Sequence, residues 1–178
     1  YQNVYMPIKP RAFELGHNKF LTMIELQKNG IRIPTSYFAA TTKMAKRILD
    51  EVKYPVIMKI PAGTQGKGVM FADSKSSASS VIDALDVFKQ PYIIQEYIET
   101  DATDIRTVVI GNKVIAMRRH ATLDELRANI HMGGIGKPID LEPDIEQLAI
   151  KSAKVIGAEI CAVDILEGTK PAVIEVNL

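Results

Sequence analysis

The chain has 178 residues, of which 47% are hydrophobic and 24% are charged, and its 22 basic residues nearly balance 21 acidic ones. This ordinary globular composition excludes disordered, collagen-like and disulfide-dense classes. The length suits one full domain or two small lobes. A formal net charge of +1 gives no reason to expect non-specific binding to nucleic acid or to a membrane surface.

The sequence also indicates a compartment. No apolar stretch is long enough to span a bilayer, and the first residues lack a secretory signal pattern. The single cysteine, Cys161, lies in the apolar run 160–163, where a buried structural thiol is a better interpretation than a reactive one. We therefore expect a cytoplasmic protein. Because the chain opens without Met and closes directly after a β-like run, we also expect a piece of a longer protein.

Helical and extended patterns alternate in the first half. Residues 1–16 contain two prolines and show no clear period. Asn18 is a candidate N-cap and Gly30 a candidate stop for the first helix. Helices are predicted over 18–29, 43–52 and 76–88, and strands over 37–39, 56–60, 69–71 and 92–98. This half therefore predicts an α+β lobe.

The second half begins with a predicted hairpin. Strands over 105–110 and 114–117 flank Gly111 and Asn112, a strong hairpin turn signal. Residues 120–140 form a long polar loop with several glycines, of a length that is often functional. A helix over 143–156 ending at Gly157 and a closing hairpin, 159–166 with 171–177, complete the predicted elements.

A glycine-rich run separates the strands predicted over 56–60 and 69–71. It consists of Gly63, Thr64, Gln65, Gly66, Lys67 and Gly68. Backbone N–H groups, a hydroxyl and an ammonium suit an anion such as phosphate. The run matches neither the Walker A loop nor the dinucleotide-binding pattern, so an ordinary glycine-rich turn is the alternative.

Lys59 interrupts the apolar strand that leads into this run, and both faces of that strand look buried. An unpaired buried ammonium is costly, so Lys59 needs an anionic partner, for which a phosphate beneath the glycine-rich run is well placed. The alternative is a lysine on an edge strand whose ammonium reaches solvent.

The closing hairpin predicts a metal site. Asp164 interrupts a buried run, whereas Glu175 and Asn177 are two apart and share a strand face. A turn near Gly168 places Asp164 roughly opposite Glu175. Three hard oxygen ligands then converge, which suits Mg²⁺ shared with nucleotide phosphates. Carboxylates on a solvated strand face are the alternative, which explains Asp164 poorly.

Three polar runs add cations: residues 104–106 with Arg106, residues 118–120, and residues 127–131 with Arg127 and Asn129. Arginine forks suit carboxylate and phosphate. Most arginines are nevertheless solvated surface residues, and this alternative applies to each of them.

Taken in order, these motifs resemble the ATP-grasp superfamily, specifically its ribosomal-protein glutamate ligase (RimK-type) branch. The stretches that carry the resemblance are 17–20, 55–60, 63–69, 94–98, 104–106, 127–134, 162–166 and 174–177. The resemblance implies an α+β ATP-grasp fold whose two lobes clamp ATP. Residues 17–97 would form the small lobe and 98–178 the C-terminal lobe. Residues 1–16 would connect to a pre-ATP-grasp domain that, like the C-terminal end, lies outside this chain.

The resemblance also implies roles for single residues. Lys19 and Lys59 would bind phosphate beneath a flap formed by residues 63–68. Glu96, Tyr97 and Ile98 would form the hinge that holds adenine, with Asp104 near the ribose. The implied catalytic residues, which would face phosphate or acyl substrate, are Arg106, Arg127 and Asn129. The implied ligands of Mg²⁺ (two ions, with Mn²⁺ as an alternative metal) are Asp164, Glu175 and Asn177.

The implied activity is that of an ATP- and Mg²⁺-dependent carboxylate–amine ligase that forms an amide through an acyl phosphate. Glutamate would be added to a protein, cofactor or small-molecule acceptor. The acyl donor could instead be a protein C-terminal carboxylate, a cofactor tail or a small amino acid. A non-catalytic ATP-binding regulatory module of the same fold is the alternative function. Nucleic acid and membranes are not expected partners, and a homo-oligomer stays open.

Overall fold

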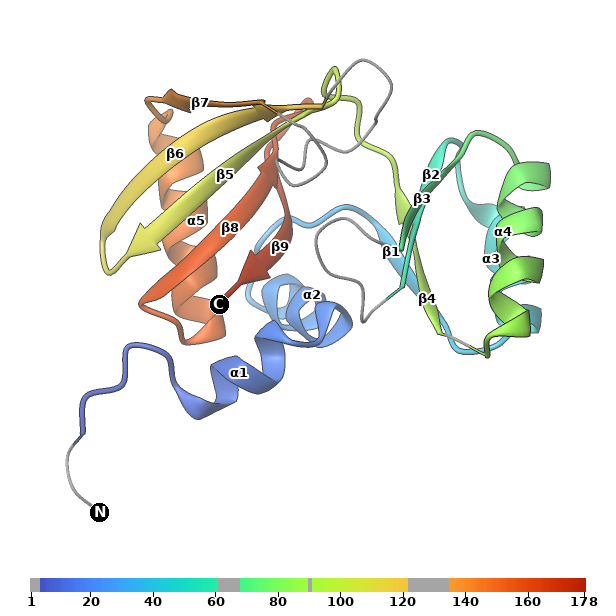
Figure 1. Cartoon of the computed structure of the whole chain (residues 1–178), viewed down its shortest axis with the longest axis horizontal. Helices are drawn as coiled ribbons and strands as arrows, with labels where there is room; N and C mark the ends of the chain where they lie inside the picture. The colour runs from blue at the N-terminus through green and yellow to red at the C-terminus, as the bar shows by residue number, and fades with distance from the viewer. Residues whose placement is uncertain (1–3, 61–67, 90, 122–134) are drawn as a thin grey trace. The chain divides into compact units, whose positions relative to one another are not determined.

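The computed structural model describes residues 4–60, 68–89, 91–121 and 135–178, and it divides into two compact units (Figure 1). One unit combines residues 1–33 with residues 100–178, and the other spans residues 34–99. The lobes expected from the sequence begin at residues 17 and 98. The difference arises because the helix over 19–28 packs against elements from the second half of the chain.

The larger unit is built on a five-stranded antiparallel sheet in the order β7-β6-β5-β8-β9. Its strands are β5 (Thr103–Ile110), β6 (Lys113–His120), β7 (Ile135–Ile139), β8 (Ile160–Leu166) and β9 (Ala172–Asn177). The predicted hairpin is confirmed, because a two-residue turn at Gly111 and Asn112 pairs Ile110 with Lys113. The predicted loop over 120–140 is wrong at its end, where residues 135–139 pair with β6 as a fifth strand.

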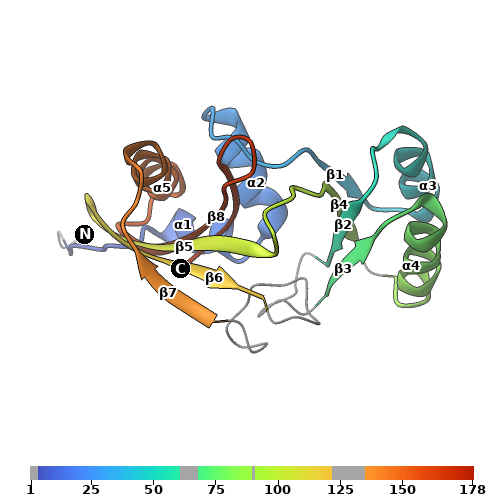
Figure 2. The ribbon, with the colours of Figure 1, turned by 90° about the horizontal axis from the view of Figure 1, so that it is seen from above.

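Helix α5 (Pro143–Ile156) covers one face of this sheet (Figures 1 and 2). Pro143 occupies its first turn, and Gly157 ends it in the left-handed conformation at φ +86°, which glycine adopts without strain. The core beneath α5 includes Ile105, Val109 and Val163. Because side chains alternate along a strand, residues 104 and 106 of β5 and residue 164 of β8 lie on the opposite face, called the outer face below.

Two helices precede the sheet in this unit, α1 (Pro10–Gly16) and α2 (Lys19–Lys28). Helix α2 was predicted, and the Asn18 side chain caps it by accepting hydrogen bonds from the N–H groups of Phe20 and Leu21 at 3.1 and 3.2 Å. Helix α1 was not predicted, since it is too short to display a period. The side chains of Ala12 and Leu15 are buried in the core beneath α5. This packing stabilises a helix that is too short to be stable by itself.

The smaller unit is a four-stranded antiparallel sheet in the order β1-β4-β2-β3 with two helices. Its elements are β1 (Ser36–Ala39), α3 (Thr42–Glu51), β2 (Val56–Lys59), β3 (Val69–Ala72), α4 (Lys75–Val87) and β4 (Tyr92–Glu96). Both helices lie on one face of the sheet (Figure 2). The N-terminus of α3 is capped by Thr41, and that of α4 by a capping box of Ser74 with Ser77. The local sequence therefore favours the same two helices that pack on the sheet.

The prediction that Lys59 lies in a strand buried on both faces is wrong. Strand β2 is not buried on both faces: Val56 and Met58 are in the helix-covered core, whereas Ile57 and Lys59 are half-buried on the other face. Nor is β2 an edge strand, because it pairs with both β3 and β4. Lys59 thus lies in an interior strand, on the face that α3 and α4 leave open.

Among the residues described, no helix combines the length and the apolar character needed to cross a membrane.

Candidate functional site

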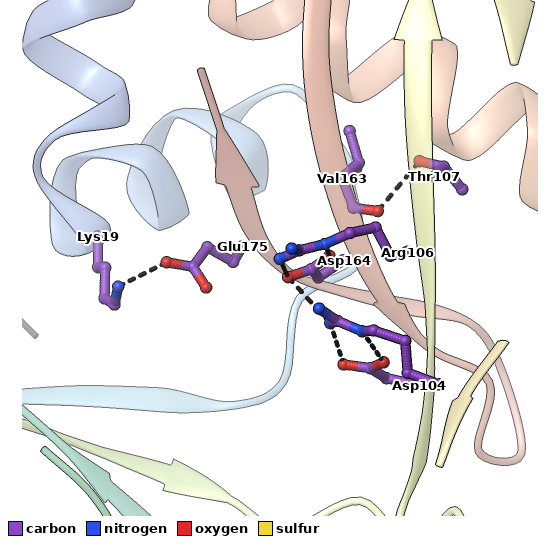
Figure 3. A network of polar contacts seen from close by, with 8 residues as sticks. Lys19, Asp104, Arg106, Thr107, Val163, Asp164 and Glu175 are labelled. Carbon is purple, nitrogen blue, oxygen red and sulfur yellow. Dashed lines mark hydrogen bonds and ion pairs between the residues drawn. The ribbon is translucent and has the colours of Figure 1, made fainter. Parts of the chain in front are cut away.

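Charged side chains from the four neighbouring strands β6, β5, β8 and β9 meet on the outer face of the five-stranded sheet (Figure 3). The cross-strand register explains this, because Asp104 lies opposite Arg119, Arg106 opposite Asp164, and Asp164 opposite Glu175. Side chains that are directly opposite in an antiparallel pair share a face and lie close together. Pairing alone therefore brings three predicted site residues (Arg106, Asp164 and Glu175) together, and the prediction that Asp164 faces Glu175 is confirmed.

A β-bulge sets the position of Glu175. The register between β8 and β9 shifts after Asp164, so that Ile165 pairs with Val173 while Asp164 pairs with Glu175. This extra residue lets Val173 and Val176 both enter the core, although they are three apart. Glu175 and Asn177 are then left together on the outer face, as predicted.

Arg106 and Asp164 form a bidentate ion pair (Figure 3). The Arg106 Nε donates to Asp164 Oδ1 at 2.8 Å, and its Nη2 donates to Oδ2 at 2.6 Å. The Asp164 side chain is 4% exposed and that of Arg106 is 30% exposed. The Asp164 carboxylate, which interrupts an apolar strand, is thus satisfied by two N–H donors of the Arg106 guanidinium.

Arg119 extends this pair into a network. It forms a bidentate pair with Asp104, Nε to Oδ1 at 2.6 Å and Nη2 to Oδ2 at 2.5 Å. Its Nη2 also lies 3.2 Å from Asp164 Oδ2. The Arg119 side chain is only 4% exposed, so it bridges two carboxylates almost without solvent.

The ionisation of this network follows from its burial. Burial alone would lower the pKa of Arg119, but the hydrogen bonds and charges of Asp104 and Asp164 outweigh it and raise that pKa. Burial raises the pKa of Asp104, and the guanidinium of Arg119 opposes this shift. Since an arginine stays protonated under all ordinary conditions, Arg119 is a fixed positive charge whose hydrogen bonds oppose the upward shift of the Asp104 pKa.

Arg119 was not among the predicted site residues. It lies in the polar run 118–120, which is typical of a solvated strand end. The signal that could have found it is the hairpin turn, because counting outward from Gly111 and Asn112 pairs Asp104 with Arg119.

Lys19 and Glu175 form a second ion pair, with Nζ donating to Oε1 at 2.5 Å (Figure 3). Lys19 is the first residue of α2, where the helix dipole disfavours a cation. A nearby carboxylate offsets this cost. Both side chains are partly exposed, at 20% and 31%, and both line a pocket between α2 and β9.

The outer-face residues fit a hard divalent cation. Asp164 and Glu175 supply carboxylate oxygens and Asn177 an amide oxygen, the ligand types that Mg²⁺ prefers. Within the described part of the chain, the buried Asn177 Nδ2 has no hydrogen-bond partner, and no group of three His, Cys, Asp or Glu residues could hold a metal. The residues predicted to bind Mg²⁺ would thus supply two carboxylates and an amide oxygen.

Other predicted site residues belong to the smaller unit. Lys59 ends β2 and Glu96 ends β4, whereas Tyr97 and Ile98 follow the strand that was predicted to include them. The Tyr97 ring packs edge-on against Phe71, with ring centroids 5.3 Å apart.

Gly68 is also in this unit, at φ +75°, and its carbonyl accepts a hydrogen bond from the N–H of Ile60 at 3.0 Å. A Cβ there would lie 3.2 Å from the Ile60 side chain. Both the positive φ and this close approach favour glycine. The remaining predicted residues lie outside the described residues: Gly63, Thr64, Gln65, Gly66, Lys67, Arg127 and Asn129.

Comparison with solved structures places the fold. A complex of the ATP-grasp ligase PsnB with a phosphomimetic variant of its minimal precursor, Mg and ADP has a TM-score of 0.75 at 22% identity, over 98% of this chain and 54% of that one. D-alanine–D-alanine ligase from Bacillus anthracis, complexed with ATP, has a TM-score of 0.75 at 17% identity, over 93% of this chain and 56% of that one. The expected α+β ATP-grasp fold is confirmed.

Comparison with curated proteins gives nearer relatives. A protein of Thioalkalivibrio sulfidiphilus named "Probable alpha-L-glutamate ligase" is 39% identical over 93% of this chain and 56% of its own length. One of the same name from Syntrophotalea carbinolica is 36% identical over 98% and 60%. The chain thus spans somewhat more than half of these relatives. The family model for the RimK-like ATP-grasp domain matches residues 16–178. The chain therefore belongs to the RimK-like ATP-grasp family, as its sequence motifs indicated.

Proposed function

We propose that this protein is an ATP- and Mg²⁺-dependent carboxylate–amine ligase that adds glutamate to an acceptor amine. The observation that carries the proposal is the outer-face pairing of Asp164 and Glu175 with Arg106 and Lys19, in a chain of the RimK-like ATP-grasp family. Curated relatives named "Probable alpha-L-glutamate ligase" support glutamate as the amino acid. The acceptor is a protein, a cofactor or a small molecule.

In the proposed reaction the γ-phosphoryl group of ATP passes to a carboxylate oxygen and ADP leaves. The amine then attacks the carbonyl carbon of the acyl phosphate, an amide forms, and phosphate leaves with one of the original carboxylate oxygens. Bound Mg²⁺ would offset charge on the transferring phosphoryl group. Asp164, Glu175 and Asn177 would hold the metal, and Lys19 and Arg106 would bind phosphate oxygens.

The residues of the smaller unit have proposed roles in nucleotide binding. Lys59 would bind phosphate, and Glu96, Tyr97 and Ile98 would hold adenine largely through backbone groups. Residues 63–68 would close over the phosphates and keep water from the acyl phosphate. Arg127 and Asn129 would face phosphate or the acyl substrate.

Asp104 was predicted to lie near the ribose. Each of its oxygens already accepts a hydrogen bond from Arg119, although a carboxylate oxygen can accept more than one. The ribose role stays a proposal, and orientation of Arg119 is a second role that the same carboxylate can serve.

The test is ADP release from MgATP over a panel of amino acids and acceptor amines, with nucleotide binding measured in parallel. We expect turnover that requires both glutamate and an acceptor. Nucleotide binding without any amino-acid-dependent turnover would contradict the proposal and favour the non-catalytic ATP-binding module.

A further inference from the structure

Each carboxylate that is expected to bind metal is ion-paired with a cation that is expected to bind phosphate. Arg106 holds both oxygens of Asp164 at 2.8 and 2.6 Å, and Lys19 holds Glu175 at 2.5 Å. Figure 3 shows both pairs on the same side of the sheet. The carboxylates proposed to bind the metal and the cations proposed to bind the phosphates are therefore ion-paired with each other.

The charges of this group of residues balance. We call it the outer-face cluster; it consists of Lys19, Asp104, Arg106, Arg119, Asp164 and Glu175, with three cations and three carboxylates. A neutral cluster has little net attraction for a divalent cation. Arg106 also donates to both oxygens of Asp164, and its positive charge opposes the approach of a metal ion to these oxygens.

The three cations differ in how easily they can leave. Arg119 is 4% exposed and forked onto Asp104, so releasing it would strand a buried carboxylate. Arg106 and Lys19 are 30% and 20% exposed. Their long side chains can turn to another anion, while Arg119 stays 3.2 Å from Asp164.

We propose that Arg106 and Lys19 are exchangeable counter-ions that keep metal off Asp164 and Glu175 until a nucleotide arrives. The phosphates of the nucleotide take the two cations, the freed carboxylates take the metal, and Arg119 keeps Asp164 in place during the exchange. This inference rests on the proposed MgATP site and deepens it. Metal and nucleotide then bind cooperatively.

The exchange has a measurable consequence in the absence of nucleotide. Removing one counter-ion leaves the outer-face cluster with a net negative charge and frees a carboxylate, so metal affinity rises. Coupling energies between linked sites usually correspond to 5–150-fold changes in affinity. We expect binding of Mn²⁺ alone to tighten about tenfold, within this range.

The experiment measures Mn²⁺ binding to the nucleotide-free chain by the electron paramagnetic resonance signal of free Mn²⁺. Arg106→Gln and Lys19→Gln are the test variants. Lys19 lies at the partly exposed edge of the cluster, so its variant serves if Arg106→Gln does not fold. Arg118→Gln is the matched control, because Arg118 pairs with Glu167 at 2.7 Å outside the cluster.

We expect tighter Mn²⁺ binding in the two test variants, no change in the control, and loss of the gain when Asp164→Asn is added to Arg106→Gln. Unchanged or weaker Mn²⁺ binding in folded Lys19→Gln and Arg106→Gln would overturn the inference, as would an equal gain in Arg118→Gln. If the wild-type chain turns over substrate but the variants bind Mn²⁺ no more tightly than wild type, the counter-ion exchange is refuted and the proposed ligase function is not. Tighter Mn²⁺ binding without any turnover would support the exchange and refute the ligase.

Discussion

Arg119 is the residue whose environment is most demanding. Its guanidinium contacts two aspartates from two different strands while remaining 4% exposed. Removing one member of a buried ion pair is strongly destabilising, because the remaining charge is left without compensation in a poorly solvated place. Exposed pairs such as Arg118 with Glu167, at 36% and 33% exposure, usually contribute much less.

We therefore predict that Arg119→Ala lowers the free energy of unfolding by about 3–5 kcal/mol. The matched variant Arg118→Ala should cost less than about 1 kcal/mol. Urea denaturation of the two variants measures both values. Equal losses in the two variants would show that the buried network contributes no more than a surface pair.

Glu175 offers the cleanest test of the proposed metal ligands. Unlike Asp164, it is partly exposed and pairs with a partly exposed lysine, so its replacement leaves the buried network intact. Glu175→Gln should reduce MgATP-dependent turnover by about 100-fold or more, since even outer partners of metal ligands contribute about 10–100-fold. Glu167→Gln is the control. Turnover that survives in Glu175→Gln at the wild-type level would remove Glu175 from the metal site.

The thiol of Cys161 provides a pH-dependent test of burial. Cys161 is 3% exposed, and burial raises its pKa from 9.0 to about 11. The buried neutral thiol stabilises the folded chain below pH 9, and this contribution is lost as pH rises from about 9 to about 11. The predicted burial of this cysteine is confirmed.

We predict that the difference in unfolding free energy between wild type and Cys161→Ala shrinks by about 1 kcal/mol between pH 8 and pH 10. Comparison with the variant removes the contributions of other groups that titrate in this range. A difference that does not change with pH would show that the thiolate forms as readily in the folded chain as in the unfolded one.

At the scale of elements, helix α5 depends on a left-handed residue at its end. Gly157 has φ +86°, and its N–H bonds the carbonyls of Ala153 and Lys154. Among the described residues, a Cβ there would meet only the Lys9 side chain, at 3.6 Å and beyond, so the cost of substitution is backbone strain and not a clash.

Gly157→Ala should therefore destabilise the chain by about 1 kcal/mol. Gly157→Asn should cost less, because asparagine tolerates the left-handed region. Thermal unfolding of the two variants distinguishes these outcomes. An alanine variant as stable as wild type would contradict the strain argument.

The strands show what sequence reasoning reached and where it stopped. The closing hairpin placed Asp164 opposite Glu175, and the structure agrees. Strand β7 was missed because its sequence, Ile135–Ile139, contains a glycine and a proline, both disfavoured in strands. It forms by pairing with β6, a partner that its own composition does not reveal.

At the scale of the whole molecule, the fold family and the charged residues could be predicted, and a hairpin register pairs Asp104 with Arg119, but the ion pairs between distant segments could not be predicted. Local caps such as Asn18 are visible in the sequence because each depends on a few neighbouring residues. The ion pair between Lys19 and Glu175 joins residues 156 apart, and α2 belongs with residues 100–178 because of packing that no local pattern encodes. The sequence identified the cations and the carboxylates as separate candidate site residues, and the fold brings them together as ion pairs.

The most direct test of the central claim follows an oxygen atom. Turnover is run once with ¹⁸O in the carboxylates of glutamate and once with ¹⁸O in those of the co-substrate, and the released phosphate is analysed by mass spectrometry. Our account predicts one ¹⁸O atom in each phosphate when glutamate carries the label, since the acyl phosphate releases a carboxylate oxygen with phosphate. Phosphate without label in both runs, while ADP and amide are formed, would contradict an acyl-phosphate ligase.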